Sequence, residues 1–203
     1  MPRSIRPAFA ALWNLDLALA GVVATSSDVR LGAIRLAWWR EQLEHLDQDG
    51  EGPAEPRLQS VAKELIPRSI TGEELSQLED AWLPLLGPFP WASDHAEGLR
   101  ERGRILFGVG ARLLGAAPEI VQAAGALWSL VDGAQHCSDP QSRIFLLNQA
   151  REDLAALQPK MPRAVRGLTI LAALGAADLV GEGRSSKRLS AAIRHKLTGA
   201  LPR

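Results

Sequence analysis

The residues able to bind metals or act as nucleophiles are few and scattered along this chain. Its four histidines are His45, His95, His136 and His195, and no two of them have the helical spacing that metal sites use. Cys137 is the single cysteine, which excludes an intramolecular disulfide and any multi-cysteine metal site. The sequence contains no nucleophile motif, P-loop or dinucleotide-binding fingerprint. Zinc, nucleophilic and nucleotide-dependent chemistries are therefore not predicted.

The acids that could carry chemistry are Asp16, Asp132 and Asp139. Asp16 interrupts an otherwise apolar helical segment, where a buried carboxylate requires a polar or charged partner. We expect Arg35 to supply that partner. Asp132 lies four residues before His136, so their side chains share one face of a helix.

The elements that must position these acids are helices. The chain has 203 residues, of which 31 are Ala and 32 are Leu, while Tyr is absent and β-branched residues are sparse. This composition predicts an all-α protein, and the length favours a single domain over residues 1–203. Lys and Arg together number 23, as do Asp and Glu, so the chain lacks the positive field that general nucleic-acid binding requires. No nucleic-acid partner is expected.

Prolines and capping residues divide the sequence into helical segments. We predict helices over residues 7–24, 28–48, 57–66, 72–86, 93–114, 118–136, 140–157, 162–179 and 186–198. Asp139 is the expected N-cap of the segment that begins at Pro140, and Gly199 is the expected C-cap after the last helix. A flexible surface loop is predicted at about 49–57, where Gly and Pro interrupt the helical pattern.

The apolar faces of these helices indicate how they pack. The second helix carries two adjoining apolar stripes, which together predict a wide buried face. One stripe comprises Leu36, Trp39, Leu43 and Leu46, and the other comprises Leu31, Ile34 and Trp38. Within the helix over 93–114, Gly103, Gly108 and Gly110 each lower helix stability, so we expect a neighbouring helix to approach closely there.

The last predicted helix, at about 186–199, is basic. Its apolar seam and nearby positive charges are Leu189, Ile193, Leu197, Arg188, Arg194 and Lys196. Such a helix is typical of binding to an anionic membrane surface. The alternative, which the pattern favours, is that the seam packs into the core and the basic face is solvated.

The N-terminal stretch Met1–Ala24 combines Arg3 and Arg6 with an Ala- and Leu-rich run, as a secretory signal peptide does. Asn14 and Asp16 interrupt that run, so neither a signal peptide nor a membrane span is predicted from it. We expect a core helix and a cytoplasmic protein, which the single cysteine also fits.

Several segments together resemble one enzyme family. Adjacent tryptophans bracketed by arginines occur in the stretch 31–40, LGAIRLAWWR, which follows WNLDLA at 13–18. The segments LWSL at 127–130 and PRAVRGL at 162–168 continue the similarity. The chain thereby resembles the squalene and phytoene synthase family, whose members often carry an Ile-Arg-Leu-Gln-Trp-Trp-Arg-like helix.

This resemblance implies an isoprenoid-synthase-like helical bundle around a central apolar cavity. Active members of the family use carboxylates four residues apart to hold magnesium ions on a prenyl diphosphate, and they join two such substrates head to head. The residues that the resemblance places at the cavity are Asp16, Arg35, Trp38, Trp39, Asp132, His136 and Asp139.

The aspartate motifs of the family are incomplete in this chain. Ala20 stands four residues after Asp16, and only Asp139 remains an acid where the second motif aligns with residues 136–140. An alternative register, which starts at Asp132, likewise keeps one acid. The resemblance therefore implies a non-catalytic protein with no cofactor. Magnesium would bind, at Asp16 and Asp139, only if the chain is an enzyme.

One branch of the family resembles the mitochondrial complex I assembly factor, which keeps the helical fold without the aspartate motifs. By resemblance, we expect isoprenoid or lipid binding, or a role in respiratory-complex assembly at the surface of the inner membrane. The expected partners are an isoprenoid diphosphate or lipid, a membrane surface, or a respiratory-complex subunit. Two alternatives stay open: an active, magnesium-dependent head-to-head prenyltransferase, and a helical scaffold without a ligand.

Overall fold

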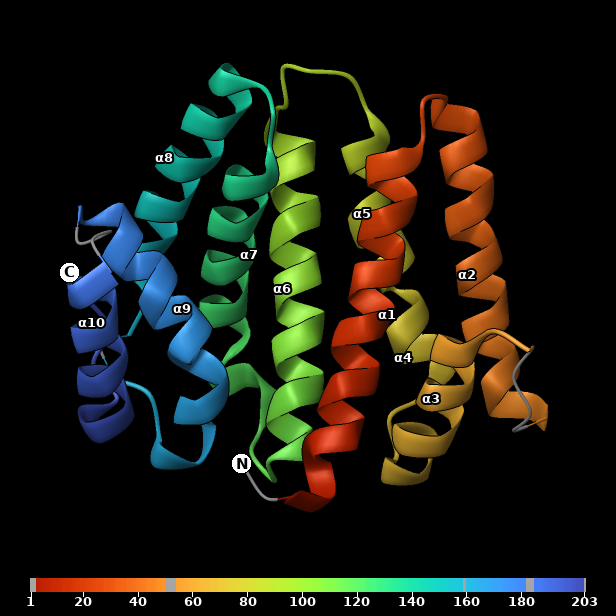
Figure 1. Cartoon of the computed structure of the whole chain (residues 1–203), viewed down its shortest axis with the longest axis horizontal. Coiled ribbons are helices and arrows are strands. Elements are labelled where there is room, and N and C mark those ends of the chain that lie inside the picture. Colours follow the sequence, from red (N-terminus) through yellow and green to blue (C-terminus); the bar gives the residue numbers. More distant parts are fainter. Residues whose placement is uncertain (1–2, 50–53, 159, 182–184, 203) are drawn as a thin grey trace. The chain divides into compact units, whose positions relative to one another are not determined.

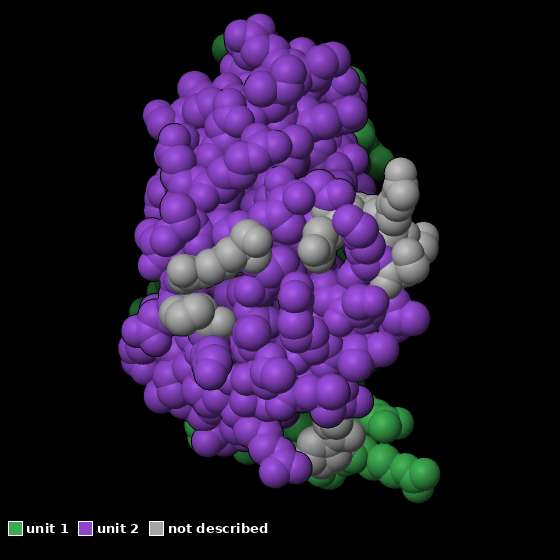
Figure 2. All heavy atoms as spheres, turned by 90° about the vertical axis from the view of Figure 1, so that its left-hand side faces the viewer, with its two compact units in different colours: residues 1–88 green, residues 89–203 purple. Residues whose placement is uncertain are grey.

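The computed structural model describes residues 3–49, 54–158, 160–181 and 185–202, and its architecture is all-α, as predicted (Figure 1). Within these ranges the only β-type pairing is an isolated bridge between Lys160 and Ala200. The chain forms two compact units, residues 1–88 and 89–203, which Figure 2 colours separately. The single-domain organisation and the central apolar cavity stay predictions.

Unit 1 contains five helices and three short 3-10 turns among its described residues. These are α1 (Arg6–Thr25), α2 (Val29–Asp49), α3 (Pro56–Glu64), α4 (Gly72–Ser76) and α5 (Leu78–Trp82), with turns at Arg3–Ile5, Ile66–Arg68 and Leu83–Leu86. The prediction of one helix over 72–86 is wrong, because the segment breaks after Ser76 and again after Trp82. Pro84 contributes to the second break, since it has no N–H to continue the α-helical ladder. Of the loop predicted at about 49–57, residues 50–53 lie outside the described part of the chain.

Unit 2 contains the remaining helices. These are α6 (Ser93–Leu113), α7 (Gln122–His136), α8 (Pro140–Ala156), α9 (Arg166–Leu179) and α10 (Ser185–Thr198), with 3-10 turns at Pro118–Ile120 and Arg163–Val165. Asp139 is the N-cap of α8, as predicted, and its carboxylate accepts the Ser142 N–H across 2.7 Å. Gly199 follows α10 with φ 78°, the left-handed conformation expected of a C-cap glycine.

Helices α6 and α7 lie side by side in unit 2 and meet backbone to backbone at Gly103 and Gly125 (Figure 1). A Cβ atom at either glycine would lie 2.1 Å from the carbonyl oxygen of the other. The close approach predicted at Gly103 is therefore confirmed. At Gly108 a Cβ atom would lie 3.5 Å from the Pro118 Cβ, which is an ordinary contact, so the expectation is not met there.

Two apolar faces that the sequence predicts to be buried are exposed. On α2 the stripe of Leu36, Trp39, Leu43 and Leu46 is buried, whereas Leu31, Ile34 and Trp38 are exposed. The helices of unit 1 that contact α2 therefore cover the first of these stripes and leave the second at the surface. On α10 the apolar seam is exposed, because the helix packs on α9 through the face that carries the buried Ala191 and His195. The favoured prediction that this seam packs into the core is wrong.

One stretch of the described residues, Arg3–Thr25, is long and apolar enough to cross a membrane. The core helix of a soluble protein and a signal sequence meet the same criteria of length and composition. The buried side chains along α1, among them Leu12, Leu15 and Leu19, fit the predicted core helix.

Candidate functional site

Asp16 lies on the buried face of α1 and is 1% exposed. Trp82, the last residue of α5, donates its indole Nε1–H to Asp16 Oδ1 across 3.1 Å. The predicted ion pair with Arg35 is wrong, because the exposed Arg35 guanidinium donates to Thr25 Oγ1 and Ser26 Oγ at 3.2 and 3.3 Å. Thr25 is the last residue of α1 and Ser26 is its C-cap, so the end of α1 supplies both hydroxyls. Within unit 1, an indole N–H thus donates to the Asp16 carboxylate.

The adjacent tryptophans of α2 occupy different environments, because successive residues of a helix point about 100° apart. Trp39 is buried in unit 1, whereas Trp38 is 40% exposed. Their rings meet edge to face, with centroids 5.3 Å apart and planes at 82°. The pair therefore connects the core of unit 1 to the outward face of α2.

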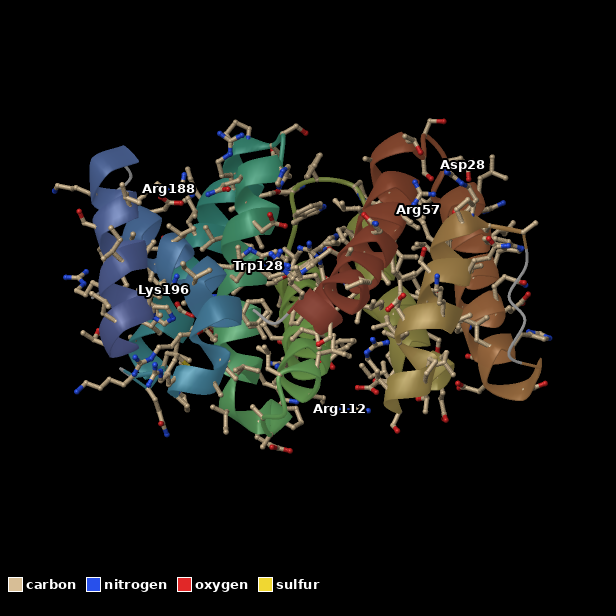
Figure 3. All side chains as sticks on the ribbon, turned by 60° about the horizontal axis from the view of Figure 1, so that its bottom comes forward. Asp28, Arg57, Arg112, Trp128, Arg188 and Lys196 are labelled. Atoms are coloured by element: carbon tan, nitrogen blue, oxygen red, sulfur yellow. The ribbon has the colours of Figure 1, made fainter. Side chains whose placement is uncertain are left out.

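Asp132 belongs to a polar cluster between α6 and α7. The buried Arg102 guanidinium donates to Asp132 Oδ2 at 2.8 Å and to Ser129 Oγ at 3.2 Å. It also lies 4.7 Å from the ring centroid of Trp128, which Figure 3 labels on α7. The Nδ1 atom of the exposed His136 lies 2.8 Å from the Asp132 carbonyl oxygen and 3.6 Å from its carboxylate. The structure thus brings the predicted residues Asp132 and His136 together.

Arg102, which the residue patterns did not single out, organises this cluster. Leu99 and Leu106 lie three residues before and four after it, and both are buried. Arg102 therefore lies on the apolar stripe of α6 that faces the core. A buried guanidinium requires an acceptor, so a single arginine within an apolar helical stripe is a signal from which a buried carboxylate opposite can be inferred.

Asp139 serves as a helix cap. Its Oδ2 atom accepts the backbone N–H and the hydroxyl of Ser142 at 2.7 and 2.6 Å. These hydrogen bonds lower the pKa of the Asp139 carboxyl below its ordinary value. The Ser142 hydroxyl oxygen in turn accepts the Trp91 N–H at 2.7 Å, which ties the start of α8 to the residues before α6.

Protein donors engage the acids that the family resemblance implies for magnesium. Magnesium in proteins prefers carboxylates that share one octahedral site with water and substrate oxygens. Here Asp16, Asp132 and Asp139 each accept hydrogen bonds from protein donors. No group of three or more His, Cys, Asp or Glu side chains that could hold a metal occurs among the residues described.

A pocket of about 770 Å³ lies in unit 2 between α6, α7 and α8 and the residues that follow α8. Its apolar wall includes Ile120, Ala123, Ala126, Leu157 and Met161. Its charged side chains are Arg100, Arg104, Glu119, Asp153 and Lys160. None of the seven residues that the resemblance places at a cavity lines this pocket.

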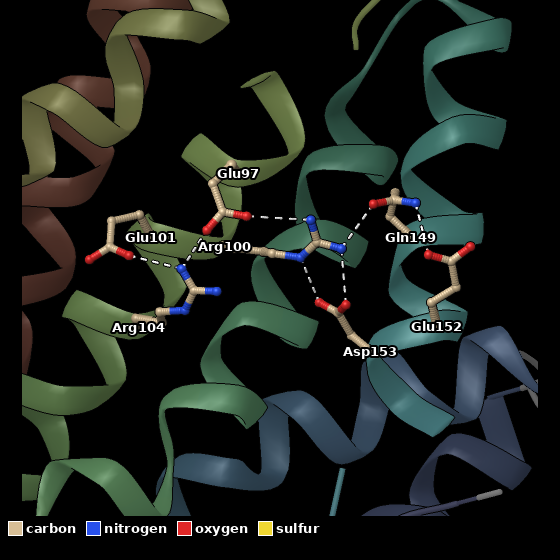
Figure 4. Close-up of polar contacts among 7 residues, drawn as sticks. All are labelled: Glu97, Arg100, Glu101, Arg104, Gln149, Glu152 and Asp153. Carbon is tan, nitrogen blue, oxygen red and sulfur yellow. Dashed lines mark hydrogen bonds and ion pairs between the residues drawn. The ribbon is translucent and has the colours of Figure 1, made fainter. Parts of the chain in front are cut away.

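Ion pairs fix the two arginines that α6 contributes to the pocket (Figure 4). Arg100 donates to both carboxylate oxygens of Asp153 at 2.8 and 2.9 Å, and these bonds raise the pKa of Arg100. Arg104 donates to Glu97 and Glu101 at 2.6 and 3.0 Å. The hydrogen bond from Arg104 lowers the pKa of Glu97. The pocket therefore has a charged wall of fixed geometry.

Comparison of the chain with protein-family models, curated proteins and solved structures found no match.

Proposed function

We propose that this chain is a non-catalytic, squalene/phytoene-synthase-like protein that binds an isoprenoid lipid and performs no chemistry on it. The observation that carries the proposal is the engagement of Asp16, Asp132 and Asp139 by an indole N–H, a guanidinium and a helix N-terminus, respectively. Metal-assisted release of diphosphate requires carboxylates that are available to share cations with the substrate. Acids held by protein donors stabilise the fold instead.

The pocket of unit 2 supports the binding part of the proposal. Its volume of about 770 Å³ falls within the range of small-molecule sites, roughly 300–1,000 Å³. Ile120, Leu157 and Met161 would contact the hydrocarbon chain of the lipid. Lys160 would face an anionic headgroup. This arrangement suits an amphiphile that carries one apolar chain and one negatively charged end.

A thermal-shift titration with farnesyl and geranylgeranyl diphosphate, each with magnesium and with a chelator, tests the proposal. A ligand that binds only the native state stabilises it by about 2.7 kcal/mol at a hundredfold excess over Kd. We expect stabilisation of equal size with and without magnesium, and none from inorganic diphosphate. Ala123→Trp fills the pocket from an exposed position and should abolish the shift, whereas Ala10→Trp, at an exposed alanine of α1, should retain it.

The same titration separates the other candidate functions. A shift that requires magnesium and is lost in Asp16→Asn, together with release of diphosphate, would overturn the proposal and establish a prenyltransferase. No shift with any isoprenoid diphosphate would overturn it in favour of a scaffold without a ligand. The role in respiratory-complex assembly rests on the resemblance alone.

A further inference from the structure

Helix α10 presents an apolar seam on its outward face. Leu189, Ile193 and Leu197 follow one another at intervals of four residues and are 62%, 51% and 73% exposed. Side chains at this spacing line one side of a helix. The opposite side carries Ala191 and His195, which are buried. The seam is therefore a continuous apolar strip at the surface of unit 2.

Positive charge flanks this seam. At about 100° per residue, Lys196 lies on one side of the seam, and Arg194 and Lys187 lie on the other. All three are exposed, and no acid occurs on α10. Figure 3 labels Lys196 and Arg188 on this helix. The outward side of α10 is thus an apolar strip with one cation on one side and two on the other.

Among the described residues, Lys187 and Lys196 form no ion pair. Asp178, the acid of α9, pairs with Arg188 at 3.4 Å. Arg166 of α9 adds positive charge beside α10, and its guanidinium donates to the carbonyl oxygens of Leu197 and Thr198 at 2.6 and 3.0 Å. After residue 162 the sequence has eight Lys and Arg but two Asp and Glu, although the whole chain has a formal net charge of zero. Positive charge is therefore segregated at this end of the chain.

We propose that α10 docks in the plane of an anionic phospholipid membrane. Leu189, Ile193 and Leu197 enter the boundary between headgroups and acyl chains, and the flanking cations contact lipid phosphates. Charge complementarity selects this occupant, because a neutral apolar partner would leave Lys187 and Lys196 without a counter-charge. The proposal uses neither the pocket nor the three acids, so it stands apart from the proposed isoprenoid binding.

Co-flotation of the full chain with vesicles tests the proposal. Neutral phosphatidylcholine vesicles are compared with vesicles that contain 30% phosphatidylglycerol, in 0.1 M and 0.5 M NaCl. Each basic residue near such a surface contributes about 1 kcal/mol, so three of them predict partitioning about a hundredfold stronger on the anionic vesicles. Raising the salt concentration should remove most of that difference, because exposed charges are screened.

Two variants separate the seam from the charges. The first carries Leu189→Gln, Ile193→Gln and Leu197→Gln, and the second carries Lys187→Gln, Arg194→Gln and Lys196→Gln. Glutamine keeps helix propensity high, and all six positions are exposed, so both variants should retain the wild-type melting temperature and helical circular dichroism. Both should lose at least tenfold in partitioning. A matched control with Leu31→Gln and Ile34→Gln, on the exposed stripe of α2, should partition as the wild type does.

Three outcomes would overturn the membrane proposal. They are equal partitioning on neutral and anionic vesicles, unchanged partitioning of the seam variant, and equal loss in the α2 control. Dimerisation in solution that the seam variant abolishes, without vesicle binding, would show instead that a second copy of the chain covers the seam. Ala123→Trp should still bind vesicles, so failure of isoprenoid binding and failure of membrane docking give different results.

Discussion

Replacing Gly103 by alanine tests the backbone contact between α6 and α7. The added Cβ would lie 2.1 Å from the carbonyl oxygen of Gly125 and 2.4 Å from its carbonyl carbon. Real Cβ contacts are essentially never shorter than 3.0 Å, so the two helices must separate by about 0.9 Å at this point. The obstacle is backbone, and no side-chain rotation can relieve it.

The expected loss follows from two costs, overpacking and lost dispersion energy, and an opposing gain in helix propensity. Overpacking typically lowers the free energy of unfolding by about 1–3 kcal/mol. The upper value applies here because whole helices must move. A separation of 0.5–1 Å also forfeits about a quarter to a half of the dispersion energy between facing atoms. Alanine recovers about 1 kcal/mol of helix propensity over glycine. Gly103→Ala should therefore lower the free energy of unfolding by about 2 kcal/mol.

Gly108→Ala is the matched control on the same helix. Its Cβ would make an ordinary contact at 3.5 Å, so the gain in propensity should raise the free energy of unfolding by about 0.5–1 kcal/mol. Urea unfolding, followed by circular dichroism at equal m-values, measures both changes. If Gly103→Ala unfolds at the same urea concentration as Gly108→Ala, or at a higher one, the inferred contact between Gly103 and Gly125 is refuted.

Two further predictions concern buried polar groups. Trp82→Phe removes the indole N–H that is donated to Asp16. The free energy of unfolding should fall by about 1.5–3 kcal/mol, as it does when a hydrogen bond to a charged group is lost. A loss below about 0.5 kcal/mol in urea unfolding would contradict this prediction. Burial lowers the pKa of His195, so below pH of about 6.5 the unfolded chain binds a proton that the folded chain resists. The free energy of unfolding should fall as the pH falls from 7 to 5, and this pH dependence should be weaker in His195→Gln. An unchanged slope in the variant would show that other groups cause the pH dependence.

The sequence predicts most helix ends because local chemistry determines them. Asp139 before Pro140 and Gly199 after the last helix satisfy the free backbone groups at helix ends. The segment 72–86 is different, since its pattern is helical throughout but the structure divides it after Ser76 and Trp82. This segment also packs against α1 and α2, and these contacts compete with its local preference for one continuous helix. The sequence pattern does not encode such contacts.

The candidate site is less predictable because periodicity identifies an apolar face without identifying its partner. The sequence gives no reason to bury Trp39 and expose Trp38, because both lie on apolar stripes of α2. The prediction that Asp16 pairs with Arg35 is wrong for the same reason, since the orientation of α2 determines where the Arg35 guanidinium lies. The position of Arg102 between two buried leucines, in contrast, is a sequence pattern that indicates a buried charge.

The incomplete aspartate motifs and the contacts of the remaining acids have a common physical basis. Two carboxylates four residues apart on one helix face repel each other, and a cation between them relieves that repulsion. With Ala20 in the second position, Asp16 is the single acid of α1, and it accepts the Trp82 indole N–H. Asp132 has His136 in the second position and a guanidinium from α6 as its donor. Protein donors thus engage both acids, as the proposed non-catalytic function requires.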